Sequence, residues 1–286
     1  MTTLSSAKTF LLSNARVLER HRFSYHFEGG SRDKVLNALK AYQNEDGGFG
    51  NALEPDKRTS SSQPIDQEIA LKILDEVGLN GDMVKDICDF LVTITTDEGG
   101  VPFTLPTAKD APHAPWWGTD EAQPSAALNP TASIAGLLHK HKHMHPWLDK
   151  ATTFCWEKLE TPDHLEVHTL LCVVLFLEHA PDQKRAEAVF NKLKDQVLNA
   201  TALELDAEGY VHPPYAFAPT PISLARQLYS DERMEKHLNA LNAQQQDDGG
   251  WPIAWPPVSS GCELEYRGVV TLNALRTLEA YAQLGK

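Results

Sequence analysis

A short phrase that ends in two glycines and an aromatic residue occurs twice in this chain, and it constrains the fold more than any other feature. Gln43-Asn-Glu-Asp-Gly-Gly-Phe49 returns as Gln245-Gln-Asp-Asp-Gly-Gly-Trp251, and an altered copy is Thr95-Thr-Asp-Glu-Gly-Gly-Val101. A weaker echo is Leu205-Asp-Ala-Glu-Gly-Tyr210, and a shortened turn lies at Thr161-Pro-Asp163. The five turns follow one another at intervals of roughly 40 to 60 residues, which is the spacing of repeat architectures. The chain is therefore predicted to use one structural unit several times.

Two kinds of helix are predicted between the turns. Amphipathic helices, with apolar residues at i, i+3/i+4 and i+7, precede the turns at 35–42, 84–91, 186–197 and 234–241. More evenly apolar helices follow the turns at 69–77, 131–138, 165–177, 222–228 and 269–281, and another is expected at 7–18. Helices that are apolar on most sides are buried on most sides. The pattern predicts an all-α chain in one domain over residues 1–286, an (α/α)6 toroid of about six inner and five outer helices.

The paired glycines of the repeated phrase indicate a structural role. Gly47-Gly48, Gly99-Gly100 and Gly249-Gly250 are expected to supply positive φ where an outer helix stops and the chain reverses. Phe49 and Trp251 are expected to fold back as apolar clasps. We therefore assign no chemistry to the phrase itself.

The repeated phrase and its spacing resemble the QW-type repeats of terpenoid cyclases and protein prenyltransferase β subunits. The resemblance covers nearly the whole chain and implies an α/α toroid that holds an apolar, isoprenoid small molecule. Some polysaccharide lyases carry similar turns, so the phrase is more specific for the fold than for the reaction. The chain departs from both families: it has no DxDD or DDxxD motif, and Ser260 precedes Cys262 where the prenyltransferases have a zinc-binding Asp. We therefore expect neither a bound metal nor a cofactor.

Composition limits the classes of partner. The net charge of 26 − 39 = −13 repels phosphate backbones, which argues against nucleic acid as a ligand. No apolar run reaches the ~20 residues that a membrane span requires. Four dispersed cysteines and no signal peptide near Met1 favour a reducing, cytoplasmic setting.

The candidate site residues lie in the loops that lead into the apolar helices, because the beginnings of these helices should meet at one rim of a central cavity. The candidate catalytic residues are the general acids Asp56 and Asp66, together with Glu263 and Tyr266. The candidate substrate-binding residues are Arg58, Trp116, Trp117, His168, Tyr215, Trp255 and Arg267. Structural roles stay open for these residues: helix capping for the aspartates, plugging of the barrel for the tryptophans, a surface ion network for Glu263 and Arg267, and a core position for His168.

Three functions follow from this site. The first is an enzyme that acts on an isoprenoid in the toroid cavity, with acid-initiated cyclisation or isomerisation. The second is a carbohydrate-active toroid, a lyase or hydrolase, in which tryptophans stack on sugar rings. The third is a binding or scaffold protein without catalysis. For the first, Asp56→Asn or Asp66→Asn should abolish turnover and leave the melting temperature nearly unchanged.

Overall fold

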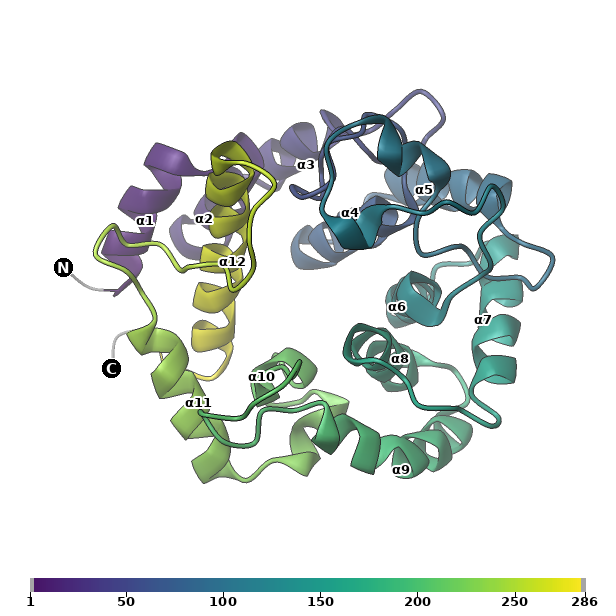
Figure 1. Ribbon diagram of the computed structural model, residues 1–286. Helices are drawn as coiled ribbons and strands as arrows, with labels where there is room; N and C mark the ends of the chain where they lie inside the picture. The colour runs from purple at the N-terminus through teal and green to yellow at the C-terminus, as the bar shows by residue number, and fades with distance from the viewer. Residues whose placement is uncertain (1–2, 284–286) are drawn as a thin grey trace. The chain divides into compact units, whose positions relative to one another are not determined.

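The computed structural model describes residues 3–283, and its architecture is all-α (Figure 1). Helices account for 60% of the residues that the structure describes. Between residues 3 and 283 the only β-type pairing consists of isolated bridges, such as the one between Gln43 and Phe49. The predicted helical class is confirmed.

The chain forms two compact units. Unit 1 combines Met1–Ala41 with Ala218–Lys286, and unit 2 is the continuous stretch Tyr42–Phe217. Each unit is described by itself below. The closure of all the helices into one toroidal domain over residues 1–286 stays a prediction.

Unit 2 is built from two rows of helices. One row contains α4 (Pro64–Val77), α6 (Leu128–Lys140) and α8 (Val167–His179), and the other contains α5 (Gly81–Ile94), α7 (Pro146–Lys158) and α9 (Gln183–Asn199). The short helix α10 (Pro214–Phe217) packs against α8. The evenly apolar segments of the sequence form the first row and amphipathic segments supply α5 and α9 of the second. The evenly apolar composition of α4, α6 and α8 therefore correctly separated this row of helices from the amphipathic one.

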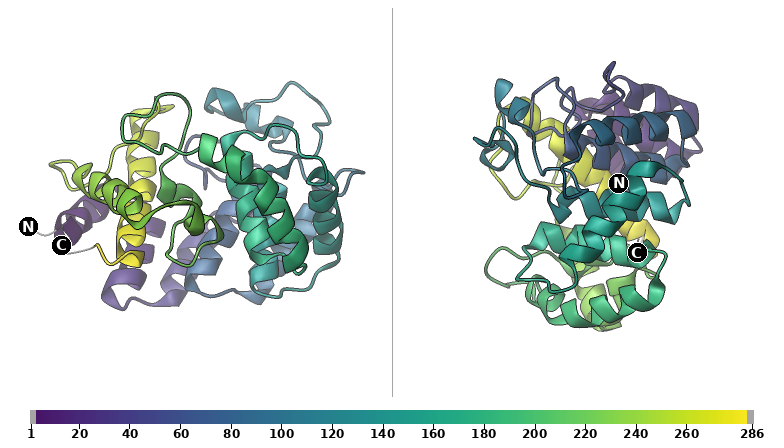
Figure 2. Two further views of the ribbon diagram at one scale, coloured as in Figure 1. Left: turned by 90° about the horizontal axis from the view of Figure 1, so that it is seen from below. Right: turned by 90° about the vertical axis from the view of Figure 1, so that its right-hand side faces the viewer.

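Small residues let α6 and α8 approach each other closely, and the two helices run side by side (Figure 2). A Cβ atom added at Gly136 of α6 would lie 2.8 Å from the carbonyl oxygen of Leu175 and 2.9 Å from Cα of Phe176. Because both atoms belong to the α8 backbone, no side-chain rotation could relieve the contact. Gly136 thus fixes the distance between the two helices.

Unit 1 contains the two ends of the chain. Its helices are α1 (Thr3–Asn14), α2 (Val17–Glu28), α3 (Arg32–Lys40), α11 (Asp231–Ala243) and α12 (Ser260–Ala280). The long helix α12 packs against α1, α2 and α11. The apolar residues Phe10, Phe23 and Leu272 are buried. The contacts of α12 with α1 and α2 join segments that lie more than two hundred residues apart in the sequence.

Two predicted apolar helices differ from the observed ones. The expected helix over 7–18 is interrupted, because Arg16 adopts an extended conformation (φ −62°, ψ 158°) between α1 and α2. The expected helix over 222–228 is wrong. A single 3-10 turn, η3, spans only Leu224–Leu228, and Ile222 is 90% exposed. The amide of Thr220 donates to the hydroxyl of Ser223 at 3.2 Å, and this side-chain contact closes a turn that competes with a helix at this point.

The glycine pairs perform two different tasks at each turn. The first glycine has positive φ, +82° at Gly47, +92° at Gly99 and +91° at Gly249, and each lies against the backbone of another helix. The second glycine meets an aromatic ring: an added Cβ would lie 2.7 Å from Phe90 at Gly48, 2.7 Å from Phe154 at Gly100 and 2.8 Å from Phe10 at Gly250. Only the first of each pair therefore supplies the expected positive φ.

The docking partner of each turn has a fixed spacing on its helix. The two glycines contact Asp86 and Phe90 on α5, Lys150 and Phe154 on α7, and Ser6 and Phe10 on α1. In every case the two partners are four residues apart, so they occupy one face of the helix. Each turn thus closes onto a helix in the same way, and the last turn of the chain docks on its first helix within unit 1.

Polar contacts complete the turns. The side-chain amide of Gln43 donates to the carbonyl of Gly47 and to Oδ2 of Asp86, both at 3.1 Å. The amide of Gln245 donates in the same way to Gly249, at 2.9 Å, and to the carbonyl of Thr3, at 2.9 Å. These residues of the repeated phrase are engaged in internal contacts, which supports the structural role assigned to it.

Alanine at Gly249 should destabilise the protein more than alanine at Gly209. Both glycines have positive φ, but an added Cβ would lie 2.2 Å from the carbonyl oxygen of Ser6 at Gly249 and would meet nothing within 4 Å at Gly209. Both variants place alanine at positive φ, so this cost is common to them. The difference between their free energies of unfolding therefore measures the clash at Gly249, and overpacking of this kind costs about 1 to 3 kcal/mol. Urea denaturation of the two variants measures this difference. Equal losses of stability would show that α1 shifts to accommodate the added methyl group.

Candidate functional site

Two long loops of unit 2 pair with each other. The loop after the first turn contains Asp56, Lys57 and Arg58, and the loop after the second turn contains Pro112 and Ala114. The amide of Arg58 donates to the carbonyl of Pro112 at 2.9 Å, and the amide of Ala114 donates to the carbonyl of Asp56 at 2.8 Å. Lys57 forms an antiparallel bridge with His113. The backbone that carries the predicted acid Asp56 is therefore fixed from both sides.

Gln63 joins the same two loops at the start of α4. Its side-chain amide donates to Oγ1 of Thr107 at 2.7 Å, and its side-chain oxygen accepts from the amide of Leu105 at 2.9 Å. Gln63 is fully buried. Because a buried amide without partners is costly, these bonds hold the second loop over the first.

Four charged side chains are buried together beneath the paired loops. The exposed fractions are 5% for Glu54, 1% for Asp56, 0% for Lys57 and 0% for Asp66. The ammonium of Lys57 contacts Oδ2 of Asp66, while Oδ1 of Asp66 accepts from the amide of Glu54 at 2.9 Å. The amide of Asp56 lies 3.4 Å from Oε1 of Glu54. Three carboxyl groups and one ammonium thus lie close together, and we call these four residues the carboxyl cluster.

Glu54 has an unusual acidity within the carboxyl cluster. Burial raises its pKa, the carboxylates of Asp66 and Asp56 act in the same direction and Lys57 opposes them, so that the pKa rises from 4.5 to about 7. Burial is the largest cause, because desolvation disfavours the charged form of a carboxyl group. Glu54 can therefore hold or release a proton near neutral pH.

An aromatic pair lies on the second loop. Trp117 stacks on Phe103, with ring centroids 5.1 Å apart and an interplanar angle of 18°, and it is 7% exposed. Trp116 is 45% exposed. Both tryptophans belong to the 3-10 turn η2 (Pro115–Trp117), whose end is held by the hydroxyl of Thr104, which donates to the carbonyl of Trp117 at 2.8 Å. The ring of Trp117 is thus packed within the loop, whereas the ring of Trp116 is partly exposed to solvent.

His168 and Tyr215 have different surroundings from the carboxyl cluster. Nε2 of His168 lies 2.7 Å from the hydroxyl of Tyr210, and the ring of His212 is 5.0 Å away. Glu166 caps the start of α8 and accepts the backbone amide of His168 at 3.0 Å. Burial raises the pKa of Tyr215 to about 12, so its phenol stays protonated at neutral pH.

The remaining predicted site residues belong to unit 1. Arg267 donates to Oδ1 of Asp248 at 2.7 Å and to the carbonyl of Trp251 at 3.1 Å, and its guanidinium lies 4.5 Å from the centroid of Phe10. It therefore holds the last turn in place. Trp255 meets Tyr266 edge to face at 4.7 Å.

The predicted residues are divided between the units. Asp56, Arg58, Asp66, Trp116, Trp117, His168 and Tyr215 lie in unit 2, whereas Trp255, Glu263, Tyr266 and Arg267 lie in unit 1. Glu263 lies in the first turn of α12. The structure brings Asp56 and Asp66 into one cluster. A single cavity lined by all of these residues stays a prediction.

Sequence reasoning missed Glu54 and Lys57. Both stand beside Asp56 in the chain, and the alternation of acid and base in Glu54-Pro-Asp56-Lys57 is a signal that could have suggested a buried ion pair. The partner of Lys57 could not be found in this way. Asp66 lies in the first turn of α4, nine residues later, and only the folded loop brings it to the ammonium.

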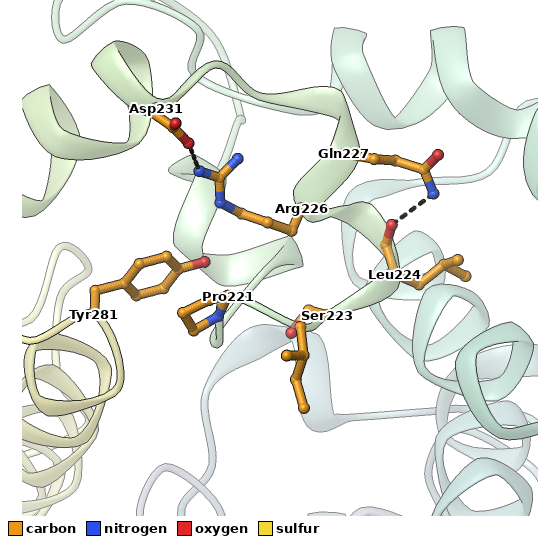
Figure 3. A pocket seen from close by; sticks show the side chains of 8 residues that line it. Pro221, Ser223, Leu224, Arg226, Gln227, Asp231 and Tyr281 are labelled. Atoms are coloured by element: carbon orange, nitrogen blue, oxygen red, sulfur yellow. Dashed lines mark hydrogen bonds and ion pairs between the residues drawn. The ribbon is translucent and has the colours of Figure 1, made fainter.

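A separate pocket of about 530 Å³ lies in unit 1 (Figure 3). Its walls include η3, Arg226, Asp231 and Tyr281. The guanidinium of Arg226 pairs with Asp231 and donates to the carbonyl of Tyr229 at 2.6 Å, and the hydroxyl of Tyr281 donates to the carbonyl of Ala218 at 2.7 Å. Burial raises the pKa of Tyr281 to about 12. The polar groups that face this pocket are already engaged with one another.

Between residues 3 and 283, no three His, Cys, Asp or Glu side chains are arranged to hold a metal ion. Across the same residues no helix combines the length and the apolar character that crossing a bilayer requires. No protein-family model matches the chain, and no curated protein matches it either.

Proposed function

We propose that this protein is an acid–base enzyme with a terpenoid-cyclase-like α/α toroid, which acts on an apolar, isoprenoid small molecule. The carboxyl cluster carries the proposal, because Glu54 is buried beside Asp66 and Asp56 and its pKa is raised to about 7. Glu54 is the proton donor in this proposal. Trp116 and Trp117 supply an aromatic wall for the apolar part of the substrate.

The acidity of Glu54 restricts the chemistry. A carboxylic acid with a pKa of about 7 is well matched to proton transfer with oxygen at neutral pH, but it is a weak acid toward an unactivated alkene. We therefore favour protonation of a hydroxyl or carbonyl oxygen, leading to dehydration or isomerisation, over direct protonation of a carbon–carbon double bond. Asp66, paired with Lys57, acts as the fixed charge that keeps the proton on Glu54.

Glu54→Gln should reduce turnover by about 10²- to 10⁴-fold, since an amide keeps the shape of the side chain but cannot deliver a proton. The assay follows consumption of prenyl alcohols and prenyl aldehydes at pH 7. The matched control is Glu45→Gln, which removes an exposed carboxylate from the first turn.

Wild-type activity should fall as the pH rises through 7, because Glu54 then loses its proton. Substrate consumption that is unchanged in the folded Glu54→Gln variant would exclude Glu54 as the proton donor. Circular dichroism of both variants excludes unfolding as the cause of a loss.

Glycoside hydrolysis is the second candidate. A carboxyl group of raised pKa next to a second carboxyl group is the arrangement that glycosidases use, and the partly exposed ring of Trp116 could stack on a sugar. Acidic and neutral oligosaccharides tested with the same variants distinguish the two. Cleavage of a sugar that depends on Glu54, with no turnover of prenyl compounds, would favour this candidate.

A further inference from the structure

A second group of reactive side chains lies where α4 and α8 meet in unit 2. Oε1 of Glu68 lies 2.8 Å from Nζ of Lys72, one turn along α4, and 3.8 Å from Sγ of Cys172 on α8. The side chain of Glu68 is 5% exposed and that of Lys72 is 51% exposed, while Cys172 is 6% exposed. A thiol, a buried carboxylate and a solvent-accessible ammonium thus form one connected set.

We propose that Cys172, Glu68 and Lys72 form a nucleophilic site that accepts acyl groups from small carboxylic esters or thioesters. Cys172 is the nucleophile, Glu68 is the general base, and Lys72 stabilises negative charge on the acyl oxygen. The three roles correspond to the general arrangement of an activated nucleophile, in which a base lies within reach of the thiol and a third group orients the base. The proposal is independent of the chemistry assigned to Glu54.

The reaction balances with water as the only co-reactant. Glu68 takes the proton of Cys172 while the sulfur attacks the acyl carbon, and the carbonyl electron pair moves to an oxyanion beside the ammonium of Lys72. Collapse of this oxyanion breaks the bond to the alcohol or thiol, which leaves with the proton from Glu68. A thioester then joins the acyl group to Cys172. Water hydrolyses it with the same base and restores the thiol.

The electrostatics of the three groups agree with these roles. Burial and the nearby carboxylates of Glu68 and Glu166 hold the pKa of Cys172 well above its usual range, so the resting thiol is neutral and attack requires a base. Attraction to the carboxylate of Glu68 outweighs the effect of desolvation and raises the pKa of Lys72. Lys72 therefore remains a cation that can face an oxyanion.

The other three cysteines differ in their surroundings. Burial raises the pKa of Cys88 to about 12, with the exposed Asp89 as a minor contributor, and burial alone raises that of Cys155. Both are fully buried. Cys262 accepts from the hydroxyl of Ser259 at 3.1 Å. These residues serve as internal comparisons, but Cys172 is the most exposed of the four at 6%, so dependence of acylation on Glu68 is what distinguishes a specific site from exposure alone.

The packing of α6 explains how Glu68 and Cys172 meet. Both α4 and α8 pack against α6, which is lined with the small residues Ala132, Ser133, Ala135 and Gly136. Small side chains on an intervening helix reduce the distance between the helices on its two sides. The contact between Glu68 and Cys172 is thus a product of the helix row in unit 2.

The test uses p-nitrophenyl acetate as the acyl donor with the full-length protein. Wild type is expected to release a burst of nitrophenolate of about one equivalent per chain, and peptide mass spectrometry should find the acetyl group on Cys172. Cys172→Ala should remove the burst, and Glu68→Gln should slow acylation by about 10²-fold or more. Lys72→Met should slow it about 10²-fold by loss of oxyanion stabilisation. The control Cys88→Ala should retain the wild-type burst.

Slow acetylation of surface lysines appears as the background in Cys172→Ala and is subtracted. If Cys172→Ala fails to fold by circular dichroism, Cys172→Ser provides the same comparison, because its hydroxyl preserves size but is a much weaker nucleophile. Acetylation of Cys172 no faster than that of Cys88, Cys155 or Cys262 would overturn the proposal. So would a burst of unchanged rate in Glu68→Gln.

Discussion

Lys57→Met is expected to lower the free energy of unfolding by about 3 to 5 kcal/mol at pH 7. Lys57 is fully buried and supplies the only ammonium of the carboxyl cluster, in which it contacts Asp66. Methionine fills a similar volume, so little packing is lost. The loss of stability comes from the carboxylate of Asp66, which stays buried without its partner.

The matched control is Lys85→Met. Lys85 also pairs with an aspartate, Asp89, but the two side chains are 66% and 50% exposed, so water can replace the partner. Its loss should therefore change the free energy of unfolding little. The double variant Lys57→Met/Asp66→Leu should recover much of the stability lost in Lys57→Met, because it removes both buried charges. Urea denaturation at pH 7 measures all three variants, and equal losses at Lys57 and Lys85 would refute a buried charge cluster.

The stability of the wild-type protein should carry a pH-dependent contribution from Glu54 that Glu54→Gln removes. The folded pKa is about 7 and the unfolded value is about 4.5, so between these values the folded state binds more protons than the unfolded state. Stability therefore falls as the pH rises from about 4.5 to about 7 and changes no further above that range. The difference in pKa corresponds to about 3 kcal/mol.

Denaturant unfolding of wild type and Glu54→Gln at pH 5 and pH 8 tests this expectation. The stability of wild type relative to the variant should decline by about 3 kcal/mol between the two pH values. Subtraction cancels the titration of all the other groups. Glu45→Gln, at an exposed position, should show no such change relative to wild type. A constant difference between wild type and Glu54→Gln would mean that Glu54 ionises as easily in the folded protein as in the unfolded one.

Periodicity allowed most helices to be predicted, because local sequence decides them. The amphipathic segments at 84–91 and 186–197 became α5 and α9, and the evenly apolar segments at 69–77 and 131–138 became α4 and α6. The exception at 222–228 has a local cause as well. Thr220 and Ser223 close a turn at its start through a side-chain hydrogen bond, and apolar content alone does not overcome this local preference.

The sequence by itself determined the helical class, the turns with their glycine pairs, and the loop that carries the acids, since these depend on residues close together in the chain. Only the tertiary structure decided which charges are buried and which side chains meet. Asp66 reaches Lys57 because a loop folds back onto the start of α4, and Cys172 reaches Glu68, more than one hundred residues away, because α4 and α8 share α6. Burial and distance set the acidity of Glu54 and Cys172, and both are properties of the packed chain.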